Sequence, residues 1–262
     1  ANNNIEVSYQ ANQLCTDHYV KKYLINPTNA YKYINDLRSK KQKDLILNLQ
    51  NEIALTMDEI VEKYGTSRAI VSALVKNGYL DVINEVASRI KIREIPIDKK
   101  IRQSKDETVV ELLNSLDTAN KPILFIPKDN TQQIDSIIQI INKYQKKQQN
   151  VLIITPEILS SYQIENIIRK KTGLSIAPIN SKLSDGEYYD YYKEIKKGNY
   201  PVVVTTPVGA LLPYNNIGAI IMINTDSDNY YNDQSPRYNL KKVMIDYASL
   251  LGSQVILTSF AP

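Results

Sequence analysis

The sequence contains 262 residues, of which 43% are hydrophobic and 23% are charged, proportions typical of an ordinary globular protein. It has no run of 18 apolar residues and does not open with a basic segment followed by an apolar one. We therefore expect neither a membrane span nor a secretory signal. The single cysteine, Cys15, excludes an intrachain disulfide and fits a reducing cytoplasm, and with only His18 nearby it does not complete a metal-ligand set.

The net charge of +4 is distributed unevenly along the chain. Residues 1–105 contain 17 Lys and Arg against 12 Asp and Glu, whereas the remaining residues contain 15 against 16. A basic first half favours a polyanionic partner such as nucleic acid. Exposed lysines that serve solubility alone are the competing interpretation.

Composition and hydrophobic patterning predict four segments. Residues 1–34 are a polar N-terminal extension with one strand at His18–Ile25. Residues 35–94 form a small domain of three helices followed by two strands. Residues 95–104 are a basic, proline-containing linker, and residues 105–262 form an α/β domain.

The small domain has clear helix boundaries. A stripe of leucines and isoleucines predicts a first helix that begins near Asp36. Thr56 and Glu59 have the spacing of a capping box, which starts a second helix that ends at Gly65. A third helix is predicted at Arg68–Lys76, before an Asn-Gly stop.

Two β-rich pieces follow the third helix, Tyr79–Asn84 and Val86–Ile92, with a turn expected near Glu85. Three helices followed by a β-hairpin is the order of a winged helix, a helix-turn-helix variant whose third helix and wing commonly contact nucleic acid. A small domain used for protein contacts is the alternative, and composition alone does not decide between them.

The second domain alternates short apolar runs with amphipathic segments. This alternation predicts right-handed crossovers and a mostly parallel sheet with helices on both faces. The expected elements are, in order, helix Lys105–Leu116, strand Ile123–Ile126, helix Gln133–Gln145, strand Val151–Thr155, helix Ile158–Lys171, strand Ser175–Ile179, helix Gly186–Lys197, strand Val202–Thr206, strand Ala219–Ile223, helix Leu240–Leu251 and strand Val255–Ser259.

Five short motifs occur in one order at one set of spacings. They are Val151-Leu-Ile-Ile-Thr-Pro-Glu-Ile158, Lys182-Leu-Ser-Asp-Gly-Glu187, Gly198-Asn-Tyr-Pro-Val-Val-Val-Thr-Thr-Pro207, Asn216-Ile-Gly-Ala-Ile-Ile221 and Ser235-Pro-Arg-Tyr238. This succession resembles the PriA family of replication-restart helicases of superfamily 2. Lys41-Gln42 and Thr66-Ser-Arg-Ala69 resemble the winged helix that precedes the motor in that family. The resemblance covers roughly residues 36–262.

The resemblance implies a winged helix followed by the first RecA-like lobe, a three-layer α/β/α unit of the P-loop NTPase fold. It also implies that the family's second lobe, its cysteine-rich zinc module and its domain for DNA 3′ ends lie outside this sequence. Two of the three expected family cofactors, ATP and Mg²⁺, depend on motifs within the first lobe, and the third, zinc, depends on the module that is absent here.

The phosphate-binding motif is missing from its expected place after strand Ile123–Ile126. The segment Pro127–Gln133 stands there, and no glycine occurs between Tyr79 and Thr172. A phosphate loop needs glycine to present its amides. Lys128 and Thr131 have the wrong order and spacing to replace the usual Lys-Thr pair, and the neighbouring Asp129 would repel phosphate.

The acidic Asp-Glu-Glu-His box of the family aligns with Ile223-Asn224-Thr225-Asp226, where an isoleucine and an asparagine replace the first two acids. These acids would hold Mg²⁺ and orient water. The third motif departs as well, at Thr258, Phe260 and Ala261. Two nucleotide motifs are thus lost together, so we expect no catalytic residue, no bound cofactor and no metal.

The residues expected to contact DNA lie in two places. Tyr230 and Tyr231 fall in the family's aromatic-rich loop, whose aromatic side chains contact single-stranded DNA. Tyr230 matches the family tyrosine, Tyr231 stands where a lysine is usual, and Arg237 matches the family's Pro-Arg-Tyr motif. Arg68 and Lys76 lie on the candidate recognition helix, where they could contact phosphates. The alternatives are an ordinary surface loop for the two tyrosines, lobe packing for Arg237, and solvated cations for Arg68 and Lys76.

The sequence therefore predicts a PriA-like component of the primosome that binds forked or single-stranded DNA as a scaffold, without ATP hydrolysis. Helicase-loading or other primosome proteins are the expected partners, with no membrane, and the expected location is the cytoplasm, associated with the nucleoid. Two alternatives stay open: an active ATP-dependent 3′→5′ DNA helicase, and a partner-binding module with neither activity.

Overall fold

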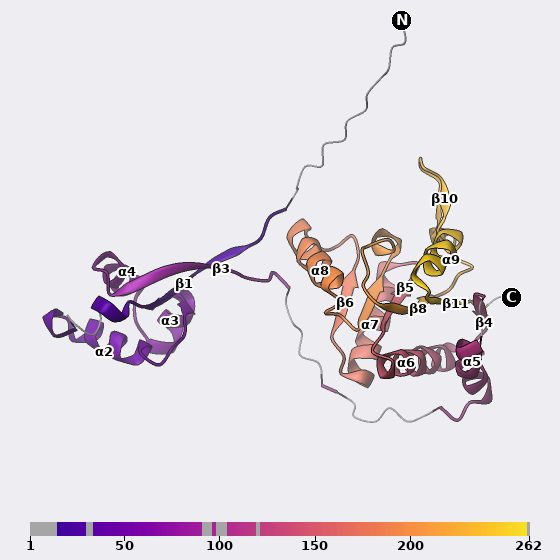
Figure 1. The fold of residues 1–262 in the computed structure, drawn as a ribbon, viewed down its shortest axis with the longest axis horizontal. Helices are drawn as coiled ribbons and strands as arrows, with labels where there is room; N and C mark the ends of the chain where they lie inside the picture. Colours follow the sequence, from indigo (N-terminus) through magenta and orange to yellow (C-terminus); the bar gives the residue numbers. More distant parts are fainter. Residues whose placement is uncertain (1–14, 30–33, 91–95, 98–103, 119–120, 261–262) are drawn as a thin grey trace, which may run out of the picture. The chain divides into compact units, whose positions relative to one another are not determined.

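The computed structural model describes residues 15–29, 34–90, 96–97, 104–118 and 121–260 (Figure 1). The chain divides into two compact units. The smaller runs from Thr16 to Arg89, and the larger contains the chain from Ile90 onward. The small unit thus begins earlier than the sequence boundary at residue 35 suggested, because a strand from the N-terminal extension is part of it.

The small unit combines three helices with a three-stranded antiparallel sheet in the order β2-β1-β3. Its elements are β1 (Tyr19–Ile25), a short 3₁₀ helix (Ile34–Asp36), α2 (Lys40–Leu49), β2 (Leu55–Thr56), α3 (Met57–Tyr64), α4 (Arg68–Lys76) and β3 (Leu80–Val86). Helix α4 has the bounds expected from the sequence. Leucine, isoleucine and valine side chains from all three helices and β3 form one buried core.

Local sequence explains where the helices of this unit begin and end. The Thr56 hydroxyl accepts from the Glu59 amide at 3.3 Å while the Glu59 carboxylate accepts from the Thr56 amide at 2.7 Å, so the predicted capping box is formed. Gly65 ends α3 in the left-handed region with φ of 58°. The Ser67 hydroxyl caps α4 by accepting from the Ile70 amide.

The hairpin expected after α4 is not formed. Strand β3 continues through Glu85 without a turn and pairs along its whole length with β1, from Tyr19 opposite Val86 to Ile25 opposite Leu80. Glu85 forms an ion pair with Lys22 of β1 at 2.7 Å, which stabilises the straight ladder at the place where a turn was expected. The long β-ribbon of this unit is therefore formed by its first and last strands, β1 and β3 (Figure 1).

The larger unit is a three-layer α/β/α lobe around a six-stranded parallel sheet. The strand order is β4-β11-β8-β5-β7-β6. The strands are β4 (Ile123–Phe125), β5 (Asn150–Ile154), β6 (Ile176–Ile179), β7 (Val202–Thr205), β8 (Ile217–Met222) and β11 (Gln254–Thr258), and the helices are α5 (Glu107–Thr118), α6 (Asn130–Lys146), α7 (Ile158–Thr172), α8 (Asp185–Lys197) and α9 (Leu240–Leu251). Short 3₁₀ helices occur at Pro207–Gly209 and Asp228–Tyr230.

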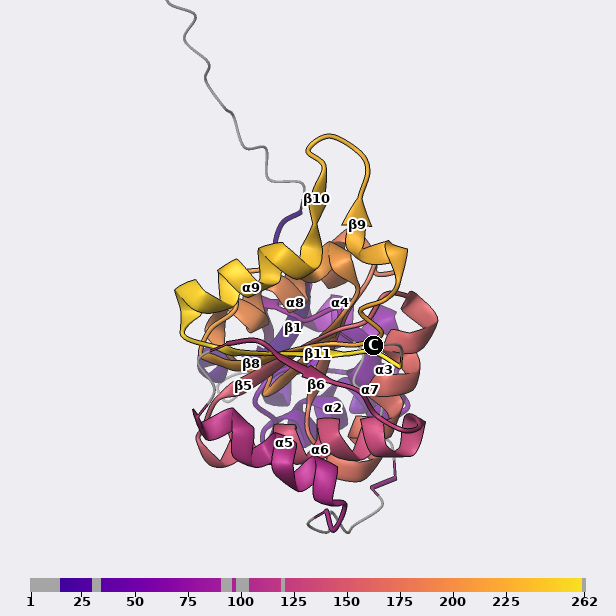
Figure 2. The same cartoon turned by 90° about the vertical axis from the view of Figure 1, so that its right-hand side faces the viewer.

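Each face of the sheet is covered by its own set of helices. Helices α5, α6 and α7 pack on one face, and α8 and α9 pack on the other (Figure 2). The strands are apolar on both faces, as parallel strands buried between helices must be: all six residues of β8 are buried. The predicted RecA-like α/β/α architecture is confirmed by this order of strands and layers.

The two capping boxes give a test of the two-unit organisation. Thr56→Ala removes the cap of α3 in the small unit, and Ser184→Ala removes the equivalent box of α8 in the lobe. Each change is expected to lower the free energy of unfolding of its own unit by about 1 kcal/mol. Hydrogen-exchange mass spectrometry would read the two units separately. Loss of protection in both units from either change would contradict independent units.

Candidate functional site

The carboxyl ends of β4, β11 and β8 meet at one edge of the lobe, because these parallel strands are neighbours in the sheet. Ligands of open α/β sheets bind at this edge. Both segments that would carry nucleotide motifs, Pro127–Gln133 after β4 and Ile223–Asp226 after β8, reach it. Any nucleotide bound by this lobe would therefore contact the residues of this edge.

The segment after β4 is closed by its own side chains. Asp129 caps α6: its Oδ1 accepts from the Gln132 amide at 2.8 Å. The Gln132 Oε1 accepts from the backbone amide of Lys128 at 2.8 Å. One amide that could face a phosphate is thus bonded to a carboxylate, and another to an amide oxygen.

Lys128 is held by Asp106, the residue that precedes α5. Its Nζ lies 3.0 Å from Asp106 Oδ2, and the Gln132 side chain donates to the same carboxylate at 2.9 Å. The hydrogen bond from Lys128 is the main cause that lowers the pKa of Asp106 below its usual value. Asp106 also accepts from the amides of Thr108 and Val109 in the first turn of α5.

A neutral polar cluster joins the three strand ends. The buried side chain of Gln133 donates to Thr258 Oγ1 at 3.0 Å and to Asn224 Oδ1 at 3.3 Å. Asn224 stands in the left-handed region with φ of 52°. The nearest acid along this loop, Asp226, is exposed and accepts a hydrogen bond from Ser259.

The residues of the loops after β4 and β8 do not fit a site for Mg²⁺ and a nucleoside triphosphate. Magnesium prefers carboxylate oxygens together with substrate phosphates, and the three described side chains of this cluster are two amides and a hydroxyl. The loop after β4 has no glycine, and the Asp129 carboxylate already accepts a hydrogen bond from the Gln132 amide. Elsewhere in the described ranges, no group of three or more His, Cys, Asp or Glu could hold a metal ion.

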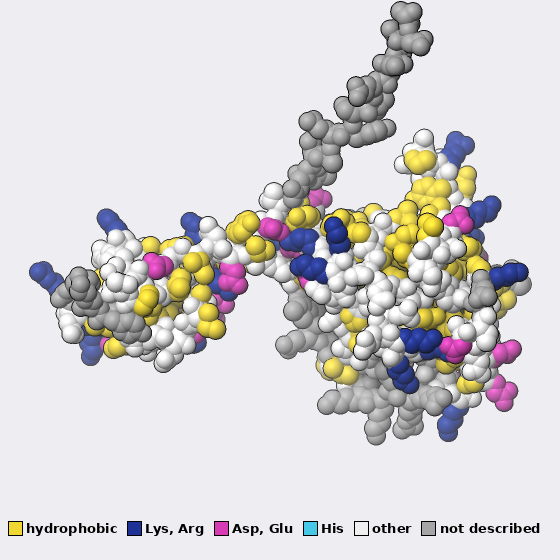
Figure 3. Space-filling model, in the orientation of Figure 1, with side chains coloured by type: hydrophobic (Ala, Val, Ile, Leu, Met, Phe, Trp, Pro, Cys, Tyr) yellow, Lys and Arg dark blue, Asp and Glu magenta, His cyan; other side chains and the backbone are white. Residues whose placement is uncertain are grey.

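A hairpin leaves the same edge of the sheet. Strands β9 (Tyr231–Asn232) and β10 (Tyr238–Asn239) pair antiparallel, and the loop between them contains a cis Ser235–Pro236 peptide bond. The hairpin extends beyond α9 in Figure 2, and Figure 3 shows a basic side chain at its tip. The Tyr231 side chain is 56% exposed, and Arg237 is exposed with its Nε donating to the Asp233 carbonyl.

Tyr230 lies inside the lobe and does not join this surface. Its side chain is 1% exposed, and its hydroxyl donates to the carbonyl of Ile154, the last residue of β5, and to that of Ile223, the first residue after β8. Burial raises the pKa of this hydroxyl. A ring enclosed in this way offers no face to a base, so direct stacking by Tyr230, expected from the sequence, does not agree with the structure.

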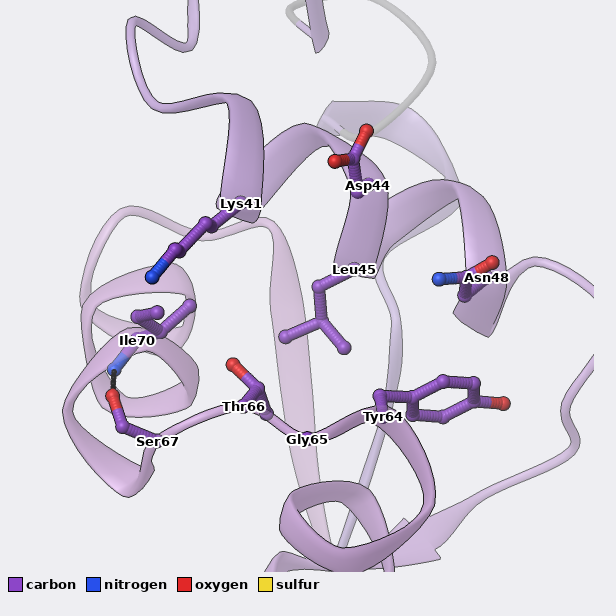
Figure 4. A pocket seen from close by; sticks show the side chains of 9 residues that line it. All are labelled: Lys41, Asp44, Leu45, Asn48, Tyr64, Gly65, Thr66, Ser67 and Ile70. Carbon is purple, nitrogen blue, oxygen red and sulfur yellow. Dashed lines mark hydrogen bonds between the residues drawn. The ribbon is translucent and has the colours of Figure 1, made fainter.

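The two cations expected to contact DNA in the small unit are both exposed on α4. Arg68 lies at the first position of the helix and forms an ion pair with Asp58, and Lys76 lies in the last turn. A charged pocket of about 360 Å³ lies beside the opening of α4 (Figure 4). Its lining includes Lys41, Thr66 and Ser67, and the Lys41 side chain points toward the turn between α3 and α4.

Two residues of these sites were not selected from the sequence. Lys41 was noted only as part of a family resemblance, and spacing alone could not place it against α4. Asp106 precedes its partner Lys128 by 22 residues. In the sequence, Asp106 stands just before a predicted helix, which is the position of an N-terminal helix cap. This position does not indicate the additional ion pair with Lys128.

Comparisons with known proteins find relatives by sequence but no matching family model. The replication restart protein PriA of Bacillus subtilis is 26% identical over 236 residues, which cover 86% of this chain and 29% of that protein. PriA of Rickettsia prowazekii is 27% identical over 70% of the chain, and PriA of Synechocystis is 30% identical over 48% of it. The chain is related to PriA.

The relation to PriA confirms the resemblance inferred from the five motifs. The chain spans about a third of the length of the curated PriA relatives that it matches, for example 29% and 30%. Among solved structures, the UvsW helicase of bacteriophage T4 covers 93% of this chain with a TM-score of 0.45 and 11% identity. The second domain of the DEAD-box helicase Mss116p gives 0.43 and 16%. These TM-scores are too low to support a fold assignment. The assignment of the RecA-like fold therefore rests on the order of the strands in the sheet.

The DNA contacts and the absence of nucleotide chemistry stay predictions for this PriA relative. So do its partners. A membrane-spanning segment is not found among the described helices, none of which is both long and apolar enough.

The buried position of Tyr230 predicts a graded loss of stability. Tyr230→Phe removes the hydroxyl from two carbonyls and is expected to lower the free energy of unfolding by about 1–3 kcal/mol. Tyr230→Ala also leaves a cavity and is expected to cost about 3–5 kcal/mol. Urea denaturation of both variants measures the difference, and Tyr231→Ala, a change at an exposed neighbour, is the matched control. Equal free energies of unfolding for all three variants would contradict the buried position of the Tyr230 side chain.

Proposed function

We propose that this PriA relative binds branched or single-stranded DNA as a scaffold in replication restart and does not hydrolyse ATP. The observation that carries the proposal is the Gln133–Asn224–Thr258 cluster, which places neutral groups where a motor lobe needs carboxylates. Helicase-loading or other primosome proteins are the partners we propose, and the nucleoid region of the cytoplasm is the location.

The loss of nucleotide chemistry is supported by two independent loops. After β4, Lys128 is directed to Asp106 and Asp129 occupies an amide of α6. After β8, Ile223 is 2% exposed and stands where the first acid would be. One altered loop could be compensated, but two altered loops leave neither a cradle for phosphate nor ligands for Mg²⁺.

We propose two separate DNA-contacting surfaces, one on each unit: the β9–β10 hairpin on the lobe and α4 on the small unit. An exposed aromatic ring such as Tyr231 can stack on a base without any nucleotide cofactor, and Arg237 at the same hairpin can contact a phosphate. Arg68, Lys76 and Lys41 bring positive charge to α4 and its opening. Phosphate contacts of this kind carry affinity and give it a salt dependence.

Titration with Mg·ATP separates the scaffold from an active helicase. We expect no heat of binding at micromolar protein and no DNA-stimulated release of phosphate. Asn224→Asp serves as a comparison, because one added carboxylate without a phosphate loop is expected to leave the protein equally inactive. Micromolar affinity for Mg·ATP in the unaltered protein would favour the helicase alternative.

Binding to a fluorescent forked DNA tests the surface. Tyr231→Ala is expected to weaken binding about tenfold through the lost stack, whereas Tyr231→Phe keeps the ring and the affinity. Arg68→Ala or Arg237→Ala is expected to reduce the slope of log K against log salt by about 1. Asp58→Asn releases Arg68 from its ion pair and is expected to strengthen binding. Salt-independent or undetectable binding by the unaltered protein would favour a partner-binding module.

A further inference from the structure

The β1–β3 ribbon of the small unit carries no surplus of positive charge. Strand β1 contains Lys21 and Lys22, strand β3 contains Asp81 and Glu85, and Lys22 forms an ion pair with Glu85 at 2.7 Å. A surface that follows a DNA backbone carries clustered Lys and Arg side chains. The charges of these two strands therefore do not fit a DNA backbone, and the proposed DNA contact of the small unit needs another surface.

The exposed face of α4 does not suit the reading of bases. Its exposed residues are Arg68, Ala69, Ser72 and Lys76. Ala69 and Ser72, which lie between the charged ends, cannot form the bidentate hydrogen bonds by which Arg, Asn or Gln side chains distinguish bases in the major groove. Arg68 is already paired with Asp58. The side chains of α4 therefore do not support a recognition helix that reads sequence.

Positive charge gathers at the first turn of α2. Arg38, Lys40 and Lys41 are exposed there, and that turn contains no acid. The helix dipole disfavours cations at this end of a helix, and α3 by contrast begins with Asp58 and Glu59. Among the described residues, no acid pairs with Lys40 or Lys41. An anionic ligand at this turn would offset the repulsion between these cations and the helix dipole.

A pocket of about 360 Å³ lies between this turn and the opening of α4. In Figure 4 the Lys41 side chain points toward Ser67 and Ile70. Thr66 lines the same pocket, and its hydroxyl can donate a hydrogen bond to a phosphate oxygen. Asp44 also lines the pocket, and its carboxylate opposes a second negative charge there. The pocket thus suits a single phosphate group beside Lys41.

We propose that the small unit holds the DNA backbone between the first turn of α2 and the opening of α4. One phosphate lies in the pocket beside Lys41, and neighbouring phosphates of the same strand lie at Lys40 and Arg38. Phosphate contacts position a protein on DNA and carry no sequence information, so the small unit binds a backbone of any sequence. This inference rests on the proposed DNA binding and names the surface and the part of the DNA that meet.

The salt dependence of binding to a fluorescent forked DNA tests this surface in the full chain. The double change Lys40→Gln with Lys41→Gln is expected to reduce the slope of log K against log salt by about 2, because two phosphate contacts are lost. Lys21→Gln with Lys146→Gln is the matched control. It removes the same charge from exposed positions on the ribbon and on α6, and is expected to leave the slope nearly unchanged.

The two possible failures of this experiment are distinct. An equal change of slope in both double variants would show that the lysines act only through net charge. That result would overturn the α2 surface while the proposed DNA binding stands. Undetectable binding of the forked DNA by the unaltered chain would overturn both. Circular dichroism of each variant checks that the fold persists, as expected for changes at exposed side chains.

An acid on the exposed face of α4 tests whether this helix enters a groove. Two residues correspond to about 200° around a helix, so Ser72 faces away from Ile70, which lines the pocket. Ser72→Glu is therefore expected to change the affinity for forked DNA by less than about threefold. Asp44→Asn, inside the pocket, is expected to strengthen binding because it removes a charge that repels phosphate. A loss of tenfold or more from Ser72→Glu would place α4 in a groove and overturn the proposal.

Discussion

The carboxyl edge of the parallel sheet imposes one constraint on the lobe: its strand-end carbonyls and loop side chains need partners once helices cover both faces. Tyr230 meets part of this need by donating to the carbonyls of Ile154 and Ile223. Gln133 meets another part by joining Asn224 and Thr258. In a motor lobe a nucleotide and its metal would share this task. Here protein side chains contact these groups.

These contacts bear on the proposed loss of the nucleotide motifs. A site that has lost acids but gained no replacement contacts would leave buried polar groups unpaired, and each such group costs about 1–3 kcal/mol. The Lys128–Asp106 pair, the Asp129 cap and the Gln133 cluster show that the replacement contacts exist. These residues therefore contribute to the stability of the lobe, as the proposed absence of ATP hydrolysis requires.

Much of the architecture could be predicted from the sequence, and the reasons are local. Helix α4 was predicted at its observed bounds because Gly65 and the Asn-Gly stop enclose it, and the parallel strands were predicted because their apolar runs are continuous. The β1–β3 pairing was missed because it joins residues far apart in the sequence, and no turn signal marks it. The burial of Tyr230 was missed for a related reason: a family motif gives a residue's place in the chain but not the direction of its side chain.

Strand β1 is made early, but its partner is made late. Tyr19 pairs with Val86, so the two residues of this pair lie 67 positions apart in the sequence. At roughly 5–20 residues per second, a ribosome needs about 3–13 seconds to make that distance of chain. During this interval the side of β1 that pairs with β3 lacks its partner, while β2 and the three helices are already made. The β1–β3 ladder is therefore the last part of the small unit for which both strands are available.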